Sequence, residues 1–376
     1  MTITAIEAIP VAYPEPNDDG RTRHLLFTRI TTEDGLVGWG EAVTMWPEAS
    51  MATKAIVDGL TPLIIGRSAS DHAALYDEIA AHMWWYGVGG IASFALSAID
   101  IALWDVAGQA SGKPLIELIG GPAHESLPVL VSCHAAEANL ESMAATMAGW
   151  VHDHDAIGIK TAFGKRGEAQ LGHDYERDRT FVRALRRELG PDSAIMIDIG
   201  AALHWDVPTA IERIKMFEEF GVAWVEEPLG ADDPAGYAEL QRHTTTKIAY
   251  GEREWNARGV QRIVDTATVD VVGVDPGRCE GITGWLKAQE HTQQAGVEIN
   301  AHAWSSAIVT AASLALSLVS SNAHQIEIKP LRNPMQHDLV TTPIVATNGR
   351  LTALPGAGLG VAVDEDILNR YSVHGS

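Results

Sequence analysis

Cysteines and membrane-length apolar runs are both scarce in this chain. Its 376 residues include only two cysteines, Cys133 and Cys279, which are too few for a disulfide framework and lack the spacing of a zinc site. We find no stretch approaching the roughly eighteen uncharged apolar residues of a membrane span. The N-terminus also lacks the charged segment and following apolar segment of a secretory signal. We therefore expect a cytoplasmic protein with no membrane partner.

Lysines and arginines are also few relative to aspartates and glutamates. There are 27 lysines and arginines against 49 aspartates and glutamates, which gives a formal net charge of −22. A polyanion would be repelled over most of this surface, so we expect no nucleic-acid partner. A small anionic substrate is still compatible with the composition, because a bound cation reverses the local field. If the substrate is an acid, the sequence has to supply a metal site.

The N-terminal third of the chain, to about residue 125, has an α+β pattern. Strand-like stretches occupy residues 3–11, 24–31 and 36–41, and Glu33-Asp34-Gly35 is a hairpin turn signal between the last two. From residue 51 to residue 119 the apolar residues recur at helical spacing. The sequence Gly120-Gly121-Pro122 ends this region.

The rest of the chain alternates short β-branched runs with amphipathic helical stretches. Helical patterns such as 177–189, 207–220 and 282–295 separate candidate strands at residues 129–133, 156–161, 194–198, 224–226, 247–251, 269–274, 297–301 and 323–327. This alternation predicts a parallel sheet, and eight strands over about 200 residues favour a closed barrel. The rival is an open sheet with a nucleotide crevice. It requires a glycine-rich loop after an early strand, and the sequence has none there.

Polar side chains end nearly every candidate strand of this second region. In chain order they are Lys160, Asp198, Glu226, Glu252, Asp275, His302 and Glu327. Catalytic side chains of parallel barrels project from these strand ends, so the ordered series predicts an active site. Asp198, Glu226 and Glu252 would repel one another unless a cation compensated their charge. Their oxygens are the hard ligands that Mg²⁺ prefers.

Several motifs resemble the enolase superfamily, in its mandelate racemase subgroup. The first is Trp224-Val225-Glu226-Glu227-Pro228-Leu229, with Asp198 before it and Gly251-Glu252 after it. Later in the chain, Asp275 precedes Gly281-Ile282-Thr283-Gly284, His302 follows Ile299-Asn300-Ala301, and Glu327 follows Gln325-Ile326. Nearer the N-terminus are Gly38-Trp39-Gly40-Glu41 and Ala98-Ile99-Asp100-Ile101-Ala102-Leu103-Trp104-Asp105. The resemblance spans nearly the whole chain. It implies an α/β fold with a modified (β/α)₇β TIM barrel at residues 126–354. An α+β capping domain at residues 1–125 would be completed by the tail at residues 355–376.

The resemblance also implies roles for the strand-end residues. The three acidic residues would bind Mg²⁺, which holds the substrate carboxylate and stabilises the enediolate formed by loss of the α-proton. His302, oriented by Asp275, would be the acid/base on one face of the substrate. Glu327 would share a hydrogen bond with an enediolate oxygen.

One position departs from the subgroup. The second barrel strand usually ends Lys-x-Lys, and the second lysine is the base on the face opposite the histidine. Here Lys160 matches the first lysine, and Ala162 occupies the place of the second. A racemase needs both bases, whereas elimination needs only His302, with Lys160 offsetting the charge of the substrate carboxylate. We therefore expect a lyase that dehydrates a sugar acid, an aldonate or aldarate, to a 2-keto-3-deoxy acid.

Other functions are compatible with the same residues. A cycloisomerase that opens a sugar-acid lactone by β-elimination also needs only one α-base. A racemase or epimerase would require Lys160 or Lys165 to replace the missing base. A relative that binds acid sugars without turnover is a further alternative, against which the intact acidic triad argues.

The substrate contacts and partners are predicted more coarsely. His134 ends the first barrel strand, His204 follows the third, and Trp46 lies in the cap, so each is a candidate substrate contact. We expect the cap loops at residues 17–24 and 44–50 to select the acid. The expected partners are a small-molecule carboxylate substrate and further copies of the chain in a homo-oligomer.

Overall fold

The computed structural model describes residues 1–373 except 88, 166, 201, 202, 204, 267, 268 and 303. Its N-terminal region contains an antiparallel sheet in the order β1 (Ile3–Glu15), β2 (Arg21–Thr32) and β3 (Val37–Met45). Pro10 and Pro14 lie on β1, an edge strand where a missing N–H breaks few ladder bonds. The β2–β3 hairpin turns at the predicted place, where Gly35 adopts a φ of 81°. All three strands are longer than the sequence predicted.

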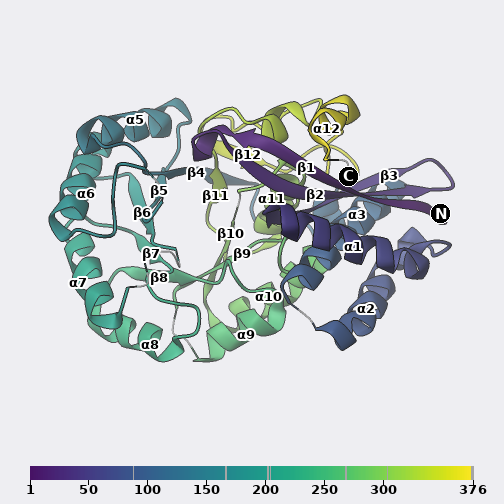
Figure 1. Ribbon diagram of the computed structural model, residues 1–376, viewed down its shortest axis with the longest axis horizontal. Coiled ribbons are helices and arrows are strands. Elements are labelled where there is room, and N and C mark those ends of the chain that lie inside the picture. The colour runs from purple at the N-terminus through teal and green to yellow at the C-terminus, as the bar shows by residue number, and fades with distance from the viewer. Residues whose placement is uncertain are drawn as a thin grey trace.

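Helices cover one face of this sheet (Figure 1). The helices that pack on its strands are α1 (Pro47–Ile64) and α3 (Ile91–Ser111). Helices α2 (His72–Met83) and α4 (Leu115–Leu118) pack on α3, and the 3₁₀ turns of this region are η1 (Pro16–Asp18), η2 (Ala69–Asp71) and η3 (Trp84–Tyr86). The longest of them, α3, packs directly on β3. A Cβ atom at Gly40 would lie 1.9 Å from the backbone oxygen of Ala98, and one at Gly38 would lie 2.3 Å from a methyl group of Val106. The glycines therefore permit the close approach of strand and helix.

The helix α3 is the longest apolar segment of the cap. Residues 91–111 are long and apolar enough to cross a membrane by length and composition, with a mean hydropathy of 1.5, although Asp100 and Asp105 interrupt them, so they are not an uncharged stretch. In the fold, 83% of this window is buried, because α3 lies between the cap sheet, α1 and α10. A helix that is apolar on all sides is typical of such a core position.

Eight parallel strands follow the cap and form the predicted barrel. The strands are β4 (Ser126–His134), β5 (Gly158–Ala162), β6 (Ala194–Asp198), β7 (Trp224–Glu226), β8 (Lys247–Tyr250), β9 (Val271–Val274), β10 (Glu298–Ala301) and β11 (Ile326–Ile328). They pair in chain order from β4 to β10, and β11 pairs with β4. This near-closed parallel sheet with an antiparallel three-stranded cap confirms the predicted fold class.

Helices surround the barrel on the outside (Figure 1). They are α5 (Leu140–Asp153), α6 (Tyr175–Leu189), α7 (Val207–Glu218), α8 (Pro234–His243), α9 (Ala257–Thr266), α10 (Gly281–Ala295) and α11 (Ala307–Val319). The helix α6 illustrates why these segments are helical. The Asp174 side chain caps its first turn by accepting the N–H of Arg177, and its buried residues Phe181, Val182 and Leu185 recur at helical spacing.

Side chains complete the barrel between β10 and β11. The Asn300 amide nitrogen donates to Glu327 Oε1 at 2.9 Å, and the Gln325 amide nitrogen donates to Asn300 Oδ1 at 3.1 Å. A backbone bond from Ile299 N to the oxygen of Asn322 adds to this contact. The seam therefore brings the last two strand ends together.

An apolar layer fills the barrel interior beneath the strand ends. Its buried members come from five strands and are Leu130, Met196, Trp224, Ala249 and Val271. In a parallel barrel such inward-facing layers make a packed core rather than a pore. The space for chemistry is thus confined to the rim at the carboxyl ends of the strands.

The segment after β11 contains η4 (Pro334–Asp338), β12 (Arg350–Thr352) and α12 (Glu365–Tyr371), and its last part contacts the cap. The strand β12 pairs antiparallel with β4, a pairing that the sequence did not predict. Leu359 N donates to Asp105 Oδ1 at 2.8 Å, and Val373 N donates to the oxygen of Pro10 at 2.8 Å. The predicted domain boundaries near residues 125 and 355 stay a prediction.

Candidate active site

The carboxyl ends of adjacent barrel strands lie side by side. In the strand register, Ala162 of β5 is opposite Asp198 of β6, and Asp198 is opposite Glu226 of β7. Glu252, Asp275 and His302 follow the last residues of β8, β9 and β10 within two positions. The parallel arrangement therefore brings the residues of the predicted series to one rim of the barrel.

Lys160 lies at the centre of the carboxylates. Its Nζ is 2.8 Å from Glu226 Oε2 and 2.8 Å from Glu327 Oε1, and all three residues are at most 4% exposed. Burial lowers the pKa of Lys160, but Glu226, Glu327 and the further carboxylates outweigh it and hold the pKa well above its ordinary value. Lys160 is therefore a fixed cation. Its predicted role in offsetting a substrate carboxylate stays a prediction, since both short contacts are with protein carboxylates.

His302 and Asp275 form a close pair beside this cluster. His302 Nδ1 is 2.7 Å from Asp275 Oδ2, and the other Asp275 oxygen accepts the N–H of Gly277 at 2.8 Å. His302 Nε2 faces the site, 3.6 Å from Glu252 Oε2. Burial lowers the pKa of His302, but Glu252 and Asp275 raise it above its ordinary value. One ring nitrogen is thus fixed by a carboxylate, and the other is directed toward the acidic cluster.

The three carboxylates predicted to bind Mg²⁺ carry an excess of negative charge. Burial raises the pKa of Glu226, Lys160 lowers it, and Asp198 and Glu252 raise it again, to about 8. Among the described residues no three His, Cys, Asp or Glu side chains already converge as a metal site would, and Lys160 takes up an oxygen of Glu226. In donor chemistry and in uncompensated charge these residues fit a hard divalent cation. The ligand set stays a prediction.

Two arginines, Arg253 after β8 and Arg278 after β9, lie near the acidic cluster. Arg253 Nε donates to Glu227 Oε2 at 2.7 Å, and Arg253 Nη2 lies 3.8 Å from Glu252 Oε1. The Arg278 guanidinium lies over the Trp255 ring, 4.9 Å from its centroid. Burial raises the pKa of Glu252, but His302, Arg278 and other cations lower it to about 2. Glu252 is therefore ionised at neutral pH.

The sequence missed two residues of this site. Asn300 is 4% exposed and binds Glu327 across the barrel seam. Arg278 contributes to the ionisation of Glu252. A buried asparagine inside an apolar strand was a usable signal for the first, because buried polar groups need partners. Arg278 had no such signal, since a loop arginine is usually solvated.

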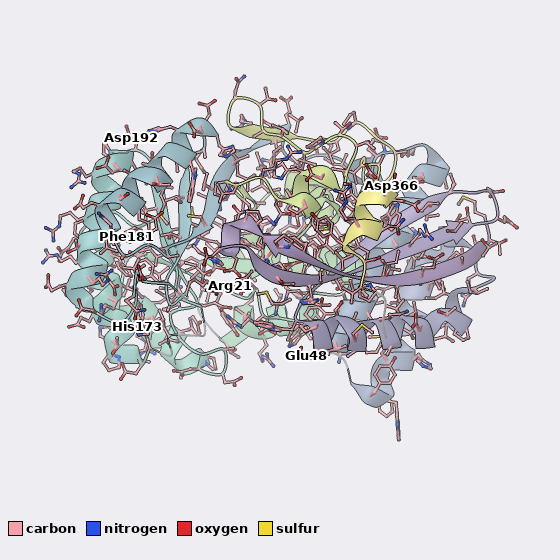
Figure 2. All side chains as sticks on the ribbon, turned by 45° about the horizontal axis from the view of Figure 1, so that its top comes forward. Arg21, Glu48, His173, Phe181, Asp192 and Asp366 are labelled. Atoms are coloured by element: carbon pink, nitrogen blue, oxygen red, sulfur yellow. The ribbon has the colours of Figure 1, made fainter. Side chains whose placement is uncertain are left out.

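The remaining predicted substrate contacts are His134, Trp46 and His204. His134 ends β4, where its Nδ1 is 3.2 Å from Asp18 of η1; Arg21 in Figure 2 marks this end of the β1–β2 hairpin. Burial lowers the pKa of His134, against the opposite effect of Asp18. Trp46 precedes α1 and is 60% exposed. His204 lies outside the described residues, and all three assignments stay predictions.

Two family models match this chain. One is described as "Mandelate racemase / muconate lactonizing enzyme, N-terminal domain" and matches residues 19–120. The other is described as "Enolase C-terminal domain-like" and matches residues 142–367. The first covers most of the cap, and the second covers the barrel from α5 to α12.

Named relatives and solved structures agree with these matches. A D-gluconate dehydratase of Thermoproteus tenax is 27% identical, over 98% of this chain and 74% of its own length. The crystal structure of a 3,6-anhydro-D-galactonate cycloisomerase from Zobellia galactanivorans is 28% identical, covers all of both chains and has a TM-score of 0.89. An enolase from Bradyrhizobium, complexed with magnesium and mandelic acid, is 26% identical over 99% of each chain, with a TM-score of 0.87.

The fold, the residues at the strand ends and the family matches lead to one assignment. The relatives include sugar-acid dehydratases and cycloisomerases, both of which are enzymes acting on small-molecule acids or their lactones. This chain belongs to the enolase superfamily, in its mandelate racemase subgroup, with acid-sugar dehydratases among its relatives.

Proposed function

We propose that this protein is a Mg²⁺-dependent dehydratase that removes the proton α to the carboxylate of a sugar acid and expels the β-hydroxyl. The observation that carries the proposal is the His302–Asp275 pair at 2.7 Å, with His302 Nε2 directed at Glu252. A histidine fixed in this way can take a proton and return it from the same atom. Elimination of water to the enol of a 2-keto-3-deoxy acid requires just these two transfers.

The proton balance closes on His302 alone. Nε2 accepts the α-proton, and the electron pair of the broken C–H bond forms a double bond between the α and β carbons as the C–O bond to the β-hydroxyl breaks. The same Nε2 returns the proton to the leaving hydroxyl, which departs as water. The enol product then tautomerises to the keto acid. Asp275 keeps Nδ1 hydrogen-bonded throughout and stabilises the charged ring.

The opposite face of the site supports elimination over racemisation. Ala162, which has no proton to transfer, stands where a second base would project. Lys160 is held between Glu226 and Glu327, and its raised pKa keeps it protonated. The Lys160 Nζ is thus engaged by two protein carboxylates, which leaves His302 as the proposed acid/base residue. Racemisation needs two.

The remaining site residues would bind the acid and its developing charge. Bound Mg²⁺ would supply Lewis-acid stabilisation of negative charge on the substrate carboxylate. Its proposed ligands are Asp198, Glu226 and Glu252. Glu327, which is held by Lys160 and Asn300, is proposed to share a hydrogen bond with the substrate carboxylate. These residues fix the acid with its α-carbon near His302.

A cycloisomerase of sugar-acid lactones is the second candidate. The similarity to a cycloisomerase structure with a TM-score of 0.89 favours it. It uses the same α-proton removal, but the leaving group is the ring oxygen of the substrate instead of a hydroxyl. The two reactions are separated by their substrates, because only a dehydratase releases water from an open-chain acid.

A substrate screen with isotope exchange tests the proposal. Aldonic acids, aldaric acids and their lactones are incubated with enzyme and Mg²⁺ in D₂O, and α-deuteration and products are followed by NMR. Replacing His302→Asn should abolish both exchange and elimination, since losing acid–base help costs about 10²–10⁴-fold in rate. The exposed His243 of α8 provides the control, and His243→Asn should retain activity.

Lys160→Met separates the alternatives. If His302→Asn exchanges the α-proton at the wild-type rate and Lys160→Met does not, Lys160 is the base. The one-base dehydratase is then wrong, and an epimerase replaces it. Turnover of lactones without turnover of any open-chain acid would instead support the cycloisomerase.

A further inference from the structure

The loop that carries His302 is held by side chains of the cap. Arg23 of β2 donates from Nη1 to the oxygen of Trp304 at 2.7 Å. Ser306 N donates to Glu41 Oε1 of β3 at 3.0 Å. Between them, Ser305 O accepts a hydrogen bond from Lys329 Nζ at 2.9 Å. Three consecutive residues just beyond the acid/base histidine are thus fixed by side chains distant in sequence, two of them from the cap.

Trp304 is the centre of this contact. Its indole is 5% exposed and donates from Nε1 to Ser132 Oγ of β4 at 2.8 Å. The His134 ring stacks on it with centroids 4.3 Å apart and planes 6° from parallel. The Arg23 guanidinium lies 5.2 Å from the indole centroid. Stacking and cation–π contact fix both the position and the tilt of the ring.

Arg23 joins this ring to the cap. It is 5% exposed, and it contacts Trp304 twice, through the ring and through the backbone oxygen. A second path runs from Asp18 of η1 through His134 to the same ring. Arg23 and Asp18 both lie in the cap segment predicted to select the substrate. A displacement of that segment should therefore shift the position of the Trp304 indole, two residues after His302.

We infer that Arg23 is a positioning residue, which acts through Trp304 to set where His302 lies relative to the substrate. Arg23 touches neither His302 nor the acidic cluster through any contact described above, so its effect is geometric. A displacement of about 1 Å at a reacting group can cost on the order of 10²-fold in rate. The inference rests on the proposed function for the acid/base role of His302, but the position of the loop can be measured without any catalytic activity.

Variants of Arg23 test the inference against a matched arginine. Arg29 lies on the same strand, 5.8 Å from the centroid of the Trp39 ring, but it pairs with Glu7 and Glu365. Arg23→Met should lower kcat by on the order of 10²-fold with a much smaller change in KM, because proton transfer is misaligned while binding groups stay. Arg23→Lys should recover part of kcat, since it restores a donor to Trp304 O. Arg29→Met should leave kcat unchanged.

Histidine NMR provides a readout that does not need turnover. With ring-labelled histidine, the His134 signal should report the stacked indole and move in Arg23→Met but not in Arg29→Met; His134→Asn assigns it. Unchanged signals of His134 and His302 in both Arg23 variants would overturn the inference. Moved signals with unchanged kcat would overturn it as well. If the wild type exchanges no α-proton of any sugar acid, the proposed function fails, and moved signals still support the Arg23–Trp304 contact.

Discussion

At the scale of single residues, the site is a balance of buried charges. Lys160 is a buried cation in contact with both Glu226 and Glu327. Burial raises the pKa of Glu226 to about 8 against the opposite effect of Lys160, and the charges of Asp198 and Glu252 add to the rise. A buried group of like charges is stable when a cation offsets the repulsion. This is the physical reason to expect a divalent ion here.

Glu226→Gln should therefore weaken Mg²⁺ binding by more than about tenfold while the fold is retained, because the amide cannot supply the lost charge. Isothermal calorimetry on the purified protein measures the affinity, and circular dichroism checks the fold. Glu239→Gln on the exposed surface of α8 is the control. An unchanged Mg²⁺ affinity in Glu226→Gln would contradict the proposed ligand set.

At the scale of elements, the cap is stabilised by the close approach of β3 to α3. Gly38 and Gly40 face the α3 backbone, where any Cβ atom would collide. This contact places Glu41, the next residue of β3, against the start of α11, where it accepts bonds from Ser306 and Val309. The packing of one strand on one helix thus positions a contact to the loop of His302.

Gly40→Ala should cost about 3 kcal/mol or more of unfolding free energy, because the added methyl meets a backbone oxygen that cannot move aside. Gly59→Ala, in the open interior of α1, should instead stabilise by about 0.5–1 kcal/mol through helix propensity. No atom lies within 4 Å of a Cβ built there. Urea unfolding of both variants measures the difference. Equal stabilities would show that β3 and α3 are not packed as described.

At the scale of the whole molecule, buried polar groups join the cap to the barrel. Glu15, at the end of β1, is fully buried, and its Oε2 lies 3.0 Å from Nζ of Lys329, which follows β11. Burial raises the pKa of Glu15, but Lys329, Asn17 and Arg23 outweigh it and lower the pKa to about 2. At the other partner burial outweighs Glu15 and lowers the pKa of Lys329. The pair therefore joins the cap to the barrel, and the lowered pKa of Glu15 links stability to pH. The cytoplasmic location and homo-oligomeric state stay predictions.

The pH dependence of stability follows from the sign of this shift. A carboxylate with a lowered pKa in the folded state stabilises above its ordinary pKa of about 4.5 and loses that contribution as the pH falls toward about 2. Between pH 5 and pH 3, wild-type unfolding free energy should fall more steeply than that of Glu15→Gln, with the surface variant Glu290→Gln as control. Urea unfolding at several pH values measures these slopes. Parallel slopes in all three proteins would mean that Glu15 does not carry the linkage.

Much of the fold was determined by the sequence alone, and the candidate site residues were predicted from it. The alternation of strands and helices is local, because each element's apolar period depends on its own residues. Their positions directly after apolar strands therefore predict Asp198, Glu226 and His302 as site residues from local sequence. The parallel register then required their ends to meet at one rim.

The tertiary structure decided which of these residues touch and what holds them. The partners of Lys160, the stacking of His134 on Trp304 and the hydrogen bond of Arg23 to that loop join residues of different elements. The pairing of β12 with β4 spans more than 200 residues of chain. Such contacts depend on how the sheet closes and how the cap docks on the barrel. The apolar period of a single helix or strand determines neither. The order of the strand ends therefore predicts which polar residues lie at the rim, whereas tertiary packing determines which of them are in contact.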